Sequence, residues 1–99
     1  MSEQQVTAIV DRVRGKLDAL ETTLEGLHSI RAAAQSPDGR VVARVDGTGA
    51  LAELRLEEAA CRMDARELAS SILTTAHAAA HAAAMQRVAL MDNLRSALR

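Results

Sequence analysis

Two histidines in the C-terminal third of the chain have a spacing that can hold a metal ion. His77 and His81 are four residues apart, so on a helix their imidazoles face the same way and can fill two positions of a zinc shell. Residue 78 is alanine, where a metalloprotease would carry glutamate, and no third ligand is evident. We therefore expect no cofactor and interpret the pair as partly exposed helix residues, with two positions of an incomplete metal shell at His77 and His81 as the alternative.

The other reactive side chains form no arrangement typical of an active site. Cys61 is the single cysteine. It has no histidine nearby in sequence that could activate it, so we interpret it as a small, half-buried apolar residue. One cysteine also excludes an internal disulfide and suits a reducing cytoplasm. Gly39, Gly47 and Gly49 fall in two expected hairpin turns. A phosphate-binding loop instead lies directly before a helix, so these glycines do not indicate a phosphate site. The sequence predicts a protein that is not an enzyme.

The basic residues form three clusters that could meet the phosphates of a nucleic acid. The charge balance is even, with 12 basic and 13 acidic residues and a formal net charge of −1, so any basic surface must be local. For a single arginine, a solvated surface position remains the alternative. Because Phe, Tyr and Trp are absent, stacking on splayed bases is unavailable and the backbone of duplex DNA is the better target. The clusters are Arg12, Arg14 and Lys16, then Arg40, Arg44 and Arg55, and then Arg87, Arg95 and Arg99.

A long amphipathic helix over about 3–28 is predicted to carry the first of these clusters. Its apolar residues are spaced alternately four and three apart, which is a heptad seam sustained for three repeats. The seam consists of Val6, Val10, Val13, Leu17, Leu20, Leu24 and Leu27. Two partners are open at this point: the chain's own core or second helix, and the same seam of another subunit, and each can apply to a different stretch of the seam. In either case the seam from Val10 to Leu27 is expected to be core or dimer interface.

Two tight turns then predict a three-stranded antiparallel meander. Ser36-Pro37-Asp38-Gly39 has the residue order of a type I turn followed by a left-handed residue, and Asp46-Gly47-Thr48-Gly49 supplies a second turn. The strands are expected at about 29–35, 40–45 and 50–56, with one apolar face built on Val41, Ala43 and Val45. The first strand depends on the turn that follows it, since its alanines would equally extend the preceding helix.

A second long helix is predicted over about 65–98. Asp64 followed by Glu67 fits a capping box, and neither Pro nor Gly interrupts the chain from there to Leu98. About 35 residues would span about 50 Å at 1.5 Å per residue, so its end must project or meet another subunit. The core lacks aromatic residues and is small, so the chain is predicted to be one α+β domain over residues 1–99 that forms a homodimer with helical arms. No signal peptide or membrane-spanning run is evident, so we expect a soluble protein.

The stretch from Ser36 to Ala80 resembles the YbaB/EbfC family of bacterial nucleoid-associated proteins. That family has a glycine turn, a valine-alternating strand, a Gly-x-Gly turn and a strand ending in Leu-x-Leu or Leu-x-Ile with an acidic residue. Here the corresponding residues are Gly39, Val41-Val42-Ala43-Arg44-Val45, Gly47-Thr48-Gly49 and Leu54-Arg55-Leu56-Glu57. The resemblance implies a homodimer with a β-rich centre and protruding helical arms that associates with DNA without marked sequence preference, in the cytoplasm at the nucleoid.

The near-neutral charge leaves a second hypothesis open. Only one lysine is present, and the Ala- and Arg-rich composition looks actinobacterial, where the family includes members associated with type VII secretion. The alternative function is therefore a dimeric protein-interaction module or adaptor with weak or no DNA binding.

Overall fold

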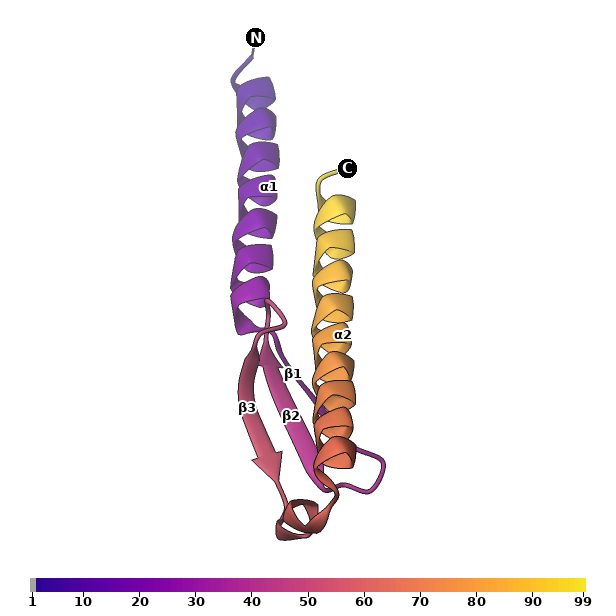
Figure 1. Ribbon diagram of the computed structural model, residues 1–99. Coiled ribbons are helices and arrows are strands. Elements are labelled where there is room, and N and C mark those ends of the chain that lie inside the picture. Colours follow the sequence, from indigo (N-terminus) through magenta and orange to yellow (C-terminus); the bar gives the residue numbers. More distant parts are fainter. Residues whose placement is uncertain (1) are drawn as a thin grey trace.

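A computed structural model describes residues 2–99 and shows two long helices that extend in the same direction from one small sheet (Figure 1). The elements follow one another as α1 (Glu3–Ser29), β1 (Arg31–Gln35), β2 (Val41–Asp46), β3 (Leu51–Leu56), a 3-10 helix η1 (Glu58–Arg62) and α2 (Ala65–Ala97). The predicted order of helix, meander and helix in an α+β fold is confirmed. The helix α1 runs through Ser29, so β1 begins two residues later than expected from the sequence.

Both helices begin at side-chain caps. Ser2 caps α1 with a full capping box, because its hydroxyl accepts from the backbone of Gln5 while the Gln5 side chain accepts from the backbone of Ser2. Asp64 caps α2 at the predicted position, because its carboxylate accepts from the backbone N–H of Arg66 at 3.2 Å; the predicted box with Glu67 reduces to this single aspartate bond. The sequence prediction identified the second cap and missed the first.

The sheet is an antiparallel meander in the order β1-β2-β3. Ala32 pairs with Val45 and Ala34 with Ala43, while on the other side of β2 Ala43 pairs with Leu54. Gly39 and Gly49 follow the two turns with φ of +75° and +87°, the left-handed conformation that glycine adopts without steric cost. These turns fix the register of the sheet.

The core lies where α2 crosses the inner faces of β1 and β2. Val41, Ala43 and Val45 of β2 are fully buried there, and Ala79 and Ala83 of α2 pack as fully buried residues on the same side. Val41 and Val45 are the largest fully buried side chains of the described residues. The core is therefore built mainly from alanine and valine, which supply little apolar area per residue.

The strand β3 is not covered by α2. Every residue of β3 is exposed, and the inner-face residues Leu54 and Leu56 each keep 37% of their surface open to solvent. The expected apolar face of this strand is thus present in the pattern but unpacked, because α2 contacts β1 and β2.

The molecule is long and thin. Its extents are 75 × 17 × 16 Å and its radius of gyration is 20.8 Å, whereas a compact chain of this length has a radius of about 13 Å. Among residues 2–99, neither α1 nor α2 is both long enough and apolar enough to span a lipid bilayer. The arms of α1 and α2 therefore carry much of the surface.

Candidate nucleic-acid interface

Most of the heptad seam of α1 is left uncovered by the chain's own second helix. α1 meets α2 through Gly26, where an added Cβ would lie 3.0 Å from Leu90 Cδ2. Leu17 and Gly26 are about two and a half turns apart on a helix of 3.6 residues per turn, so they point in opposite directions. Thr23, one turn before Leu27, is buried at 7% exposure and belongs to the α2-facing side. Within the described chain, α2 and the core therefore cover the seam only at its end, at Leu27.

The seam is open to solvent along most of its length. Leu17 and Leu24 each expose 55% of their surface, and Leu27 is the one member that is partly buried. Ile9, which sequence reasoning left out, widens the open surface beside Val10 and Val13. The exposed members are Val6, Val10, Val13, Leu17, Leu20 and Leu24.

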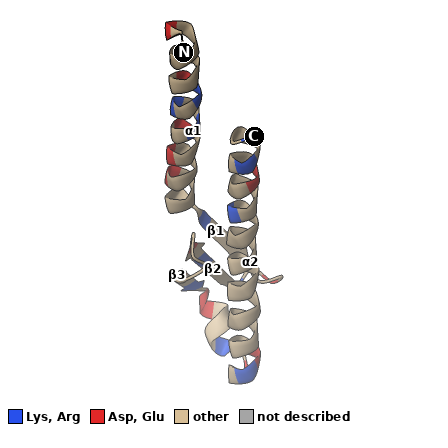
Figure 2. Cartoon of the chain, turned by 90° about the horizontal axis from the view of Figure 1, so that it is seen from above, with Lys and Arg blue, Asp and Glu red and all other residues tan. Residues whose placement is uncertain are grey.

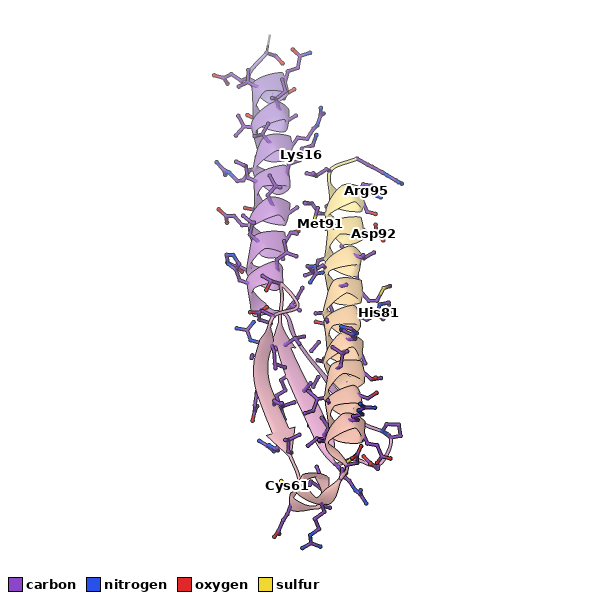
Figure 3. All side chains as sticks on the ribbon, in the orientation of Figure 1. Lys16, Cys61, His81, Met91, Asp92 and Arg95 are labelled. Atoms are coloured by element: carbon purple, nitrogen blue, oxygen red, sulfur yellow. The ribbon has the colours of Figure 1, made fainter. Side chains whose placement is uncertain are left out.

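A groove extends this apolar surface onto α2. Leu27 at the lower end of the seam lines the same groove as Ala84, Val88 and Met91 of α2, and Met91 projects from α2 toward α1 (Figure 3). Val88 and Met91 are about half exposed. We call the seam together with Val88 and Met91 the open apolar surface.

The three arginines predicted to contact DNA from the sheet are each paired with an acidic group, whereas Arg31 of β1 donates to the backbone carbonyls of His28 and Ile30. Arg44 Nε lies 3.3 Å from Glu53 Oε2, and Arg55 Nη2 lies 3.1 Å from Glu53 Oε1, so one carboxylate serves two predicted DNA-contact residues. Arg40 pairs with Asp38 at 3.8 Å. Glu53 is the residue that sequence reasoning missed here, although its position opposite Arg44 follows from the register of β2 and β3.

Arg87 has a structural partner. Its guanidinium donates to the backbone carbonyl of Gly47, in the turn between β2 and β3, and the residue is partly buried. The same glycine leaves no room for a side chain, because an added Cβ would lie 2.6 Å from the carbonyl oxygen of Leu27. Arg87 therefore fastens α2 to the turn.

The other cations of the predicted DNA-contact set lie toward the distal ends of the two arms, whereas Arg62 of η1 and Arg66 of α2 lie at the opposite end of the molecule. Lys16 lies on α1 near the level of the C-terminal end of α2, where Arg95 is found (Figure 3). Lys16 shares the side of buried Thr23, seven residues on, and Arg12 lies one turn further out on that side. Arg95 is 3.5 Å from Asp92 but its side chain stays 72% exposed. We call Arg12, Lys16, Arg95 and Arg99 the distal basic group.

Arg14 is separated from this group. It lies on the side of α1 that also carries Asp18, Glu21 and Glu25 at helical spacing. The acidic residues of α1 lie mainly nearer the sheet, below the basic ones, while basic residues also mark the outer end of α2 (Figure 2). The structure thus divides the first sequence cluster between two faces.

The two turns of the sheet hold carboxylates in fixed positions. The Thr48 hydroxyl donates to Asp46 Oδ1 at 2.6 Å and lowers the pKa of that carboxyl, and the backbone N–H groups of Thr48 and Ala50 add to the effect. The Ser36 hydroxyl does the same for the pKa of Asp38, with the backbone N–H of Arg40. Both carboxylates therefore organise turns.

The other reactive side chains stay apart. Cys61 lies in η1 at the end of the molecule opposite the arms (Figure 3) and is exposed, so its interpretation as a half-buried apolar residue is wrong. The short helix η1, which the sequence analysis did not assign, turns the chain outward there. His77 and His81 are both exposed on α2. Residues 2–99 contain no group of three metal-ligating side chains.

Comparison with known proteins places the chain in a family. The structure is similar to the crystal structure of uncharacterized protein HP0035 from Helicobacter pylori, with a TM-score of 0.66 and 18% sequence identity over 95% of this chain and 97% of that one. A comparison with curated proteins gives no match. The family model described as the YbaB/EbfC DNA-binding family matches residues 3–98. Since that match spans nearly the whole chain, the protein belongs to the YbaB/EbfC DNA-binding family.

Proposed function

We propose that this protein is a nucleoid-associated protein of the cytoplasm that binds duplex DNA, with little sequence preference, as a homodimer. Family membership supports DNA as the partner. The main structural support is that the same two helices carry both the open apolar surface and, at their far end, the distal basic group. The first surface joins two copies, and the second meets phosphates.

The open apolar surface is best buried by a second copy of the chain. Fully burying a Leu or Val side chain contributes about 1.5–3 kcal/mol, and the monomer leaves six seam residues exposed while its core holds two large, fully buried side chains. A heptad seam is self-complementary, since its apolar residues pack into the spaces of an identical helix. Association of two copies supplies the burial that one copy lacks.

Two copies also double the number of cations available to DNA. One chain contributes the four residues of the distal basic group, and each phosphate neutralised changes the slope of log K against log salt by about −0.9. One chain therefore predicts a slope of about −3.6, and a dimer using both sets predicts about −7. Arginine and lysine contacts to phosphate carry no sequence information, which supports binding with little sequence preference.

Retardation of two duplexes of unrelated sequence tests the function. We expect both to be retarded by micromolar protein in about 50 mM salt, and binding to weaken at least about a thousandfold at about 200 mM, because phosphate contacts dominate. No retardation at the lower salt would overturn DNA binding for this protein. A large difference in affinity between the two duplexes would overturn the lack of sequence preference.

A further inference from the structure

The exposed side of α2 carries a second chemical feature that DNA binding does not use. His77 and His81 are one turn apart in the uninterrupted helix Ala65–Ala97, and Met85 follows at the next turn with 52% of its surface exposed. Residues four apart on a helix have Cβ atoms about 5–6 Å apart. The two imidazoles therefore lie on one side of α2, with a thioether beyond them.

The helix fixes the backbone positions of this pair on one side of α2. Ala79 and Ala83 are fully buried against the sheet, which anchors α2 on both sides of His81. His81 follows Ala79 by two residues, about 200° around the helix axis at 3.6 residues per turn, so it projects to the solvent side. His81 is visible on the exposed surface of α2 (Figure 3).

Neither imidazole is engaged elsewhere. Among residues 2–99 no hydrogen bond and no ion pair of less than 4.0 Å involves His77 or His81. The residues between them and just after them include Ala78, Ala80 and Ala84, which are too small to cover the rings, and Leu73 and Met85 in the neighbouring turns are themselves more than half exposed. Arg87, the nearest cation along α2, is turned toward Gly47. In the single chain, the ring nitrogens are open to a ligand from solvent.

We propose that His77 and His81 form a bidentate surface site for a divalent transition-metal ion. Neutral imidazole is a ligand for copper, nickel and zinc and a poor one for magnesium or calcium. Two imidazole nitrogens at about 2.0–2.1 Å occupy two adjacent positions of the ion, and water fills the others. Since residues 2–99 hold no group of three His, Cys, Asp or Glu side chains that could bind one ion, the site is open and exchangeable and differs from a closed structural zinc site. One ion binds per chain.

Nickel(II) is the probe that tests this site in the full-length protein. Titration calorimetry is expected to show one nickel ion per chain, and magnesium is expected to give no heat of binding. Replacing either histidine, as His77→Asn or His81→Asn, is expected to weaken nickel binding on the order of a hundredfold, because the second ligand acts at high effective concentration. His28→Asn removes an exposed histidine from α1 and is expected to change nothing.

A relocated histidine provides the matched control. The double variant His81→Ala with Met85→His keeps three histidines but places two of them eight residues, about 12 Å, apart along α2, which is too far for one ion. Nickel raises the melting temperature of the wild type, because an ion that binds the folded helix stabilises it, and this rise is expected to vanish in the double variant. The proposal is overturned if wild type binds no nickel, if binding survives in the double variant, or if one ion binds per two chains.

Discussion

Gly26 of α1 lies directly against Leu90 of α2, so closely that an added Cβ would be 3.0 and 3.2 Å from the two terminal carbons of the leucine. This contact sets how the two arms meet above the sheet. It also places Leu17 of the heptad seam on the side of α1 away from α2, because Leu17 and Gly26 lie on opposite sides of the helix.

Replacing Gly26 with leucine is expected to lower the free energy of unfolding by about 1–3 kcal/mol, since the added side chain must displace Leu90. At Gly15 an added Cβ has no neighbouring atom within 4 Å. Replacing Gly15 with leucine is therefore expected to stabilise the helix by up to about 1 kcal/mol, because leucine has a higher helix propensity than glycine. Thermal unfolding of the two variants followed by circular dichroism measures both shifts. Equal effects at the two glycines would contradict the close contact.

Arg87 is predicted to matter for stability more than for DNA. Arg87→Met keeps the apolar stem but loses the bond to the Gly47 carbonyl, which should cost about 1–2 kcal/mol of unfolding free energy. Arg95→Met is the control, since its exposed pair with Asp92 is worth under about 1 kcal/mol. Denaturant titration of both variants measures the two losses of unfolding free energy. A loss for Arg95→Met as large as that for Arg87→Met would remove the structural role assigned here.

The carboxylates of the turns predict a loss of stability in acid. The pKa of Asp46 lies below its ordinary value of 3.8 in the folded protein, chiefly through the hydroxyl of Thr48. Its stabilisation is therefore present at neutral pH and is lost as the pH falls through the lowered pKa. Melting temperatures measured from neutral pH to below 3.8 should fall more steeply in the wild type than in Asp46→Asn. Parallel curves would show that this carboxylate does not contribute.

Lys16 and Arg14 test which side of α1 meets DNA. Lys16→Gln and Arg14→Gln remove the same charge two residues apart, but Lys16 lies on the side of Thr23 and Arg14 on the acidic side. Lys16→Gln is expected to weaken binding to all duplexes and to reduce the salt slope by about 0.9 for each copy that makes the contact. Arg14→Gln should change the slope less. The titration uses fluorescence anisotropy at several salt concentrations, and the opposite ranking would move the DNA surface to the acidic side.

The seam is expected to control assembly. Light scattering should give about twice the 10.5 kDa mass of one chain, and Leu20→Asp should dissociate or unfold the dimer, because burying an unpaired charge costs several kcal/mol. Thr22→Asp adds the same charge to an exposed position off the seam and should leave the mass unchanged. A wild-type chain that scatters as a monomer would rule out the dimer.

Local sequence signals predicted most of the fold. The alternation of Val41, Ala43 and Val45 and the glycines after the two turns gave the meander, and Asp64 gave the start of α2. The capping box at Ser2 and Gln5 was also readable from the sequence but was missed.

Other features depended on tertiary contacts. The direction of the seam could not be predicted, because periodicity identifies an apolar side of α1 without saying what α2 covers. The pairing of Arg44 and Arg55 with one Glu53 required the strand register, and the bond from Arg87 to Gly47 joins residues 40 positions apart. The charge pattern of the sequence does not distinguish these arginines from one another. Their hydrogen-bond and ion-pair partners in the structure do.

The most direct test of the account is the sedimentation of a labelled duplex of about 20 base pairs, which spans about 68 Å at 3.4 Å per pair, with the wild-type protein in low salt. We predict that the duplex sediments with two copies of the chain bound and that the complex dissociates as salt is raised. A duplex that sediments alone, or one that carries a single chain, would contradict a DNA-binding homodimer.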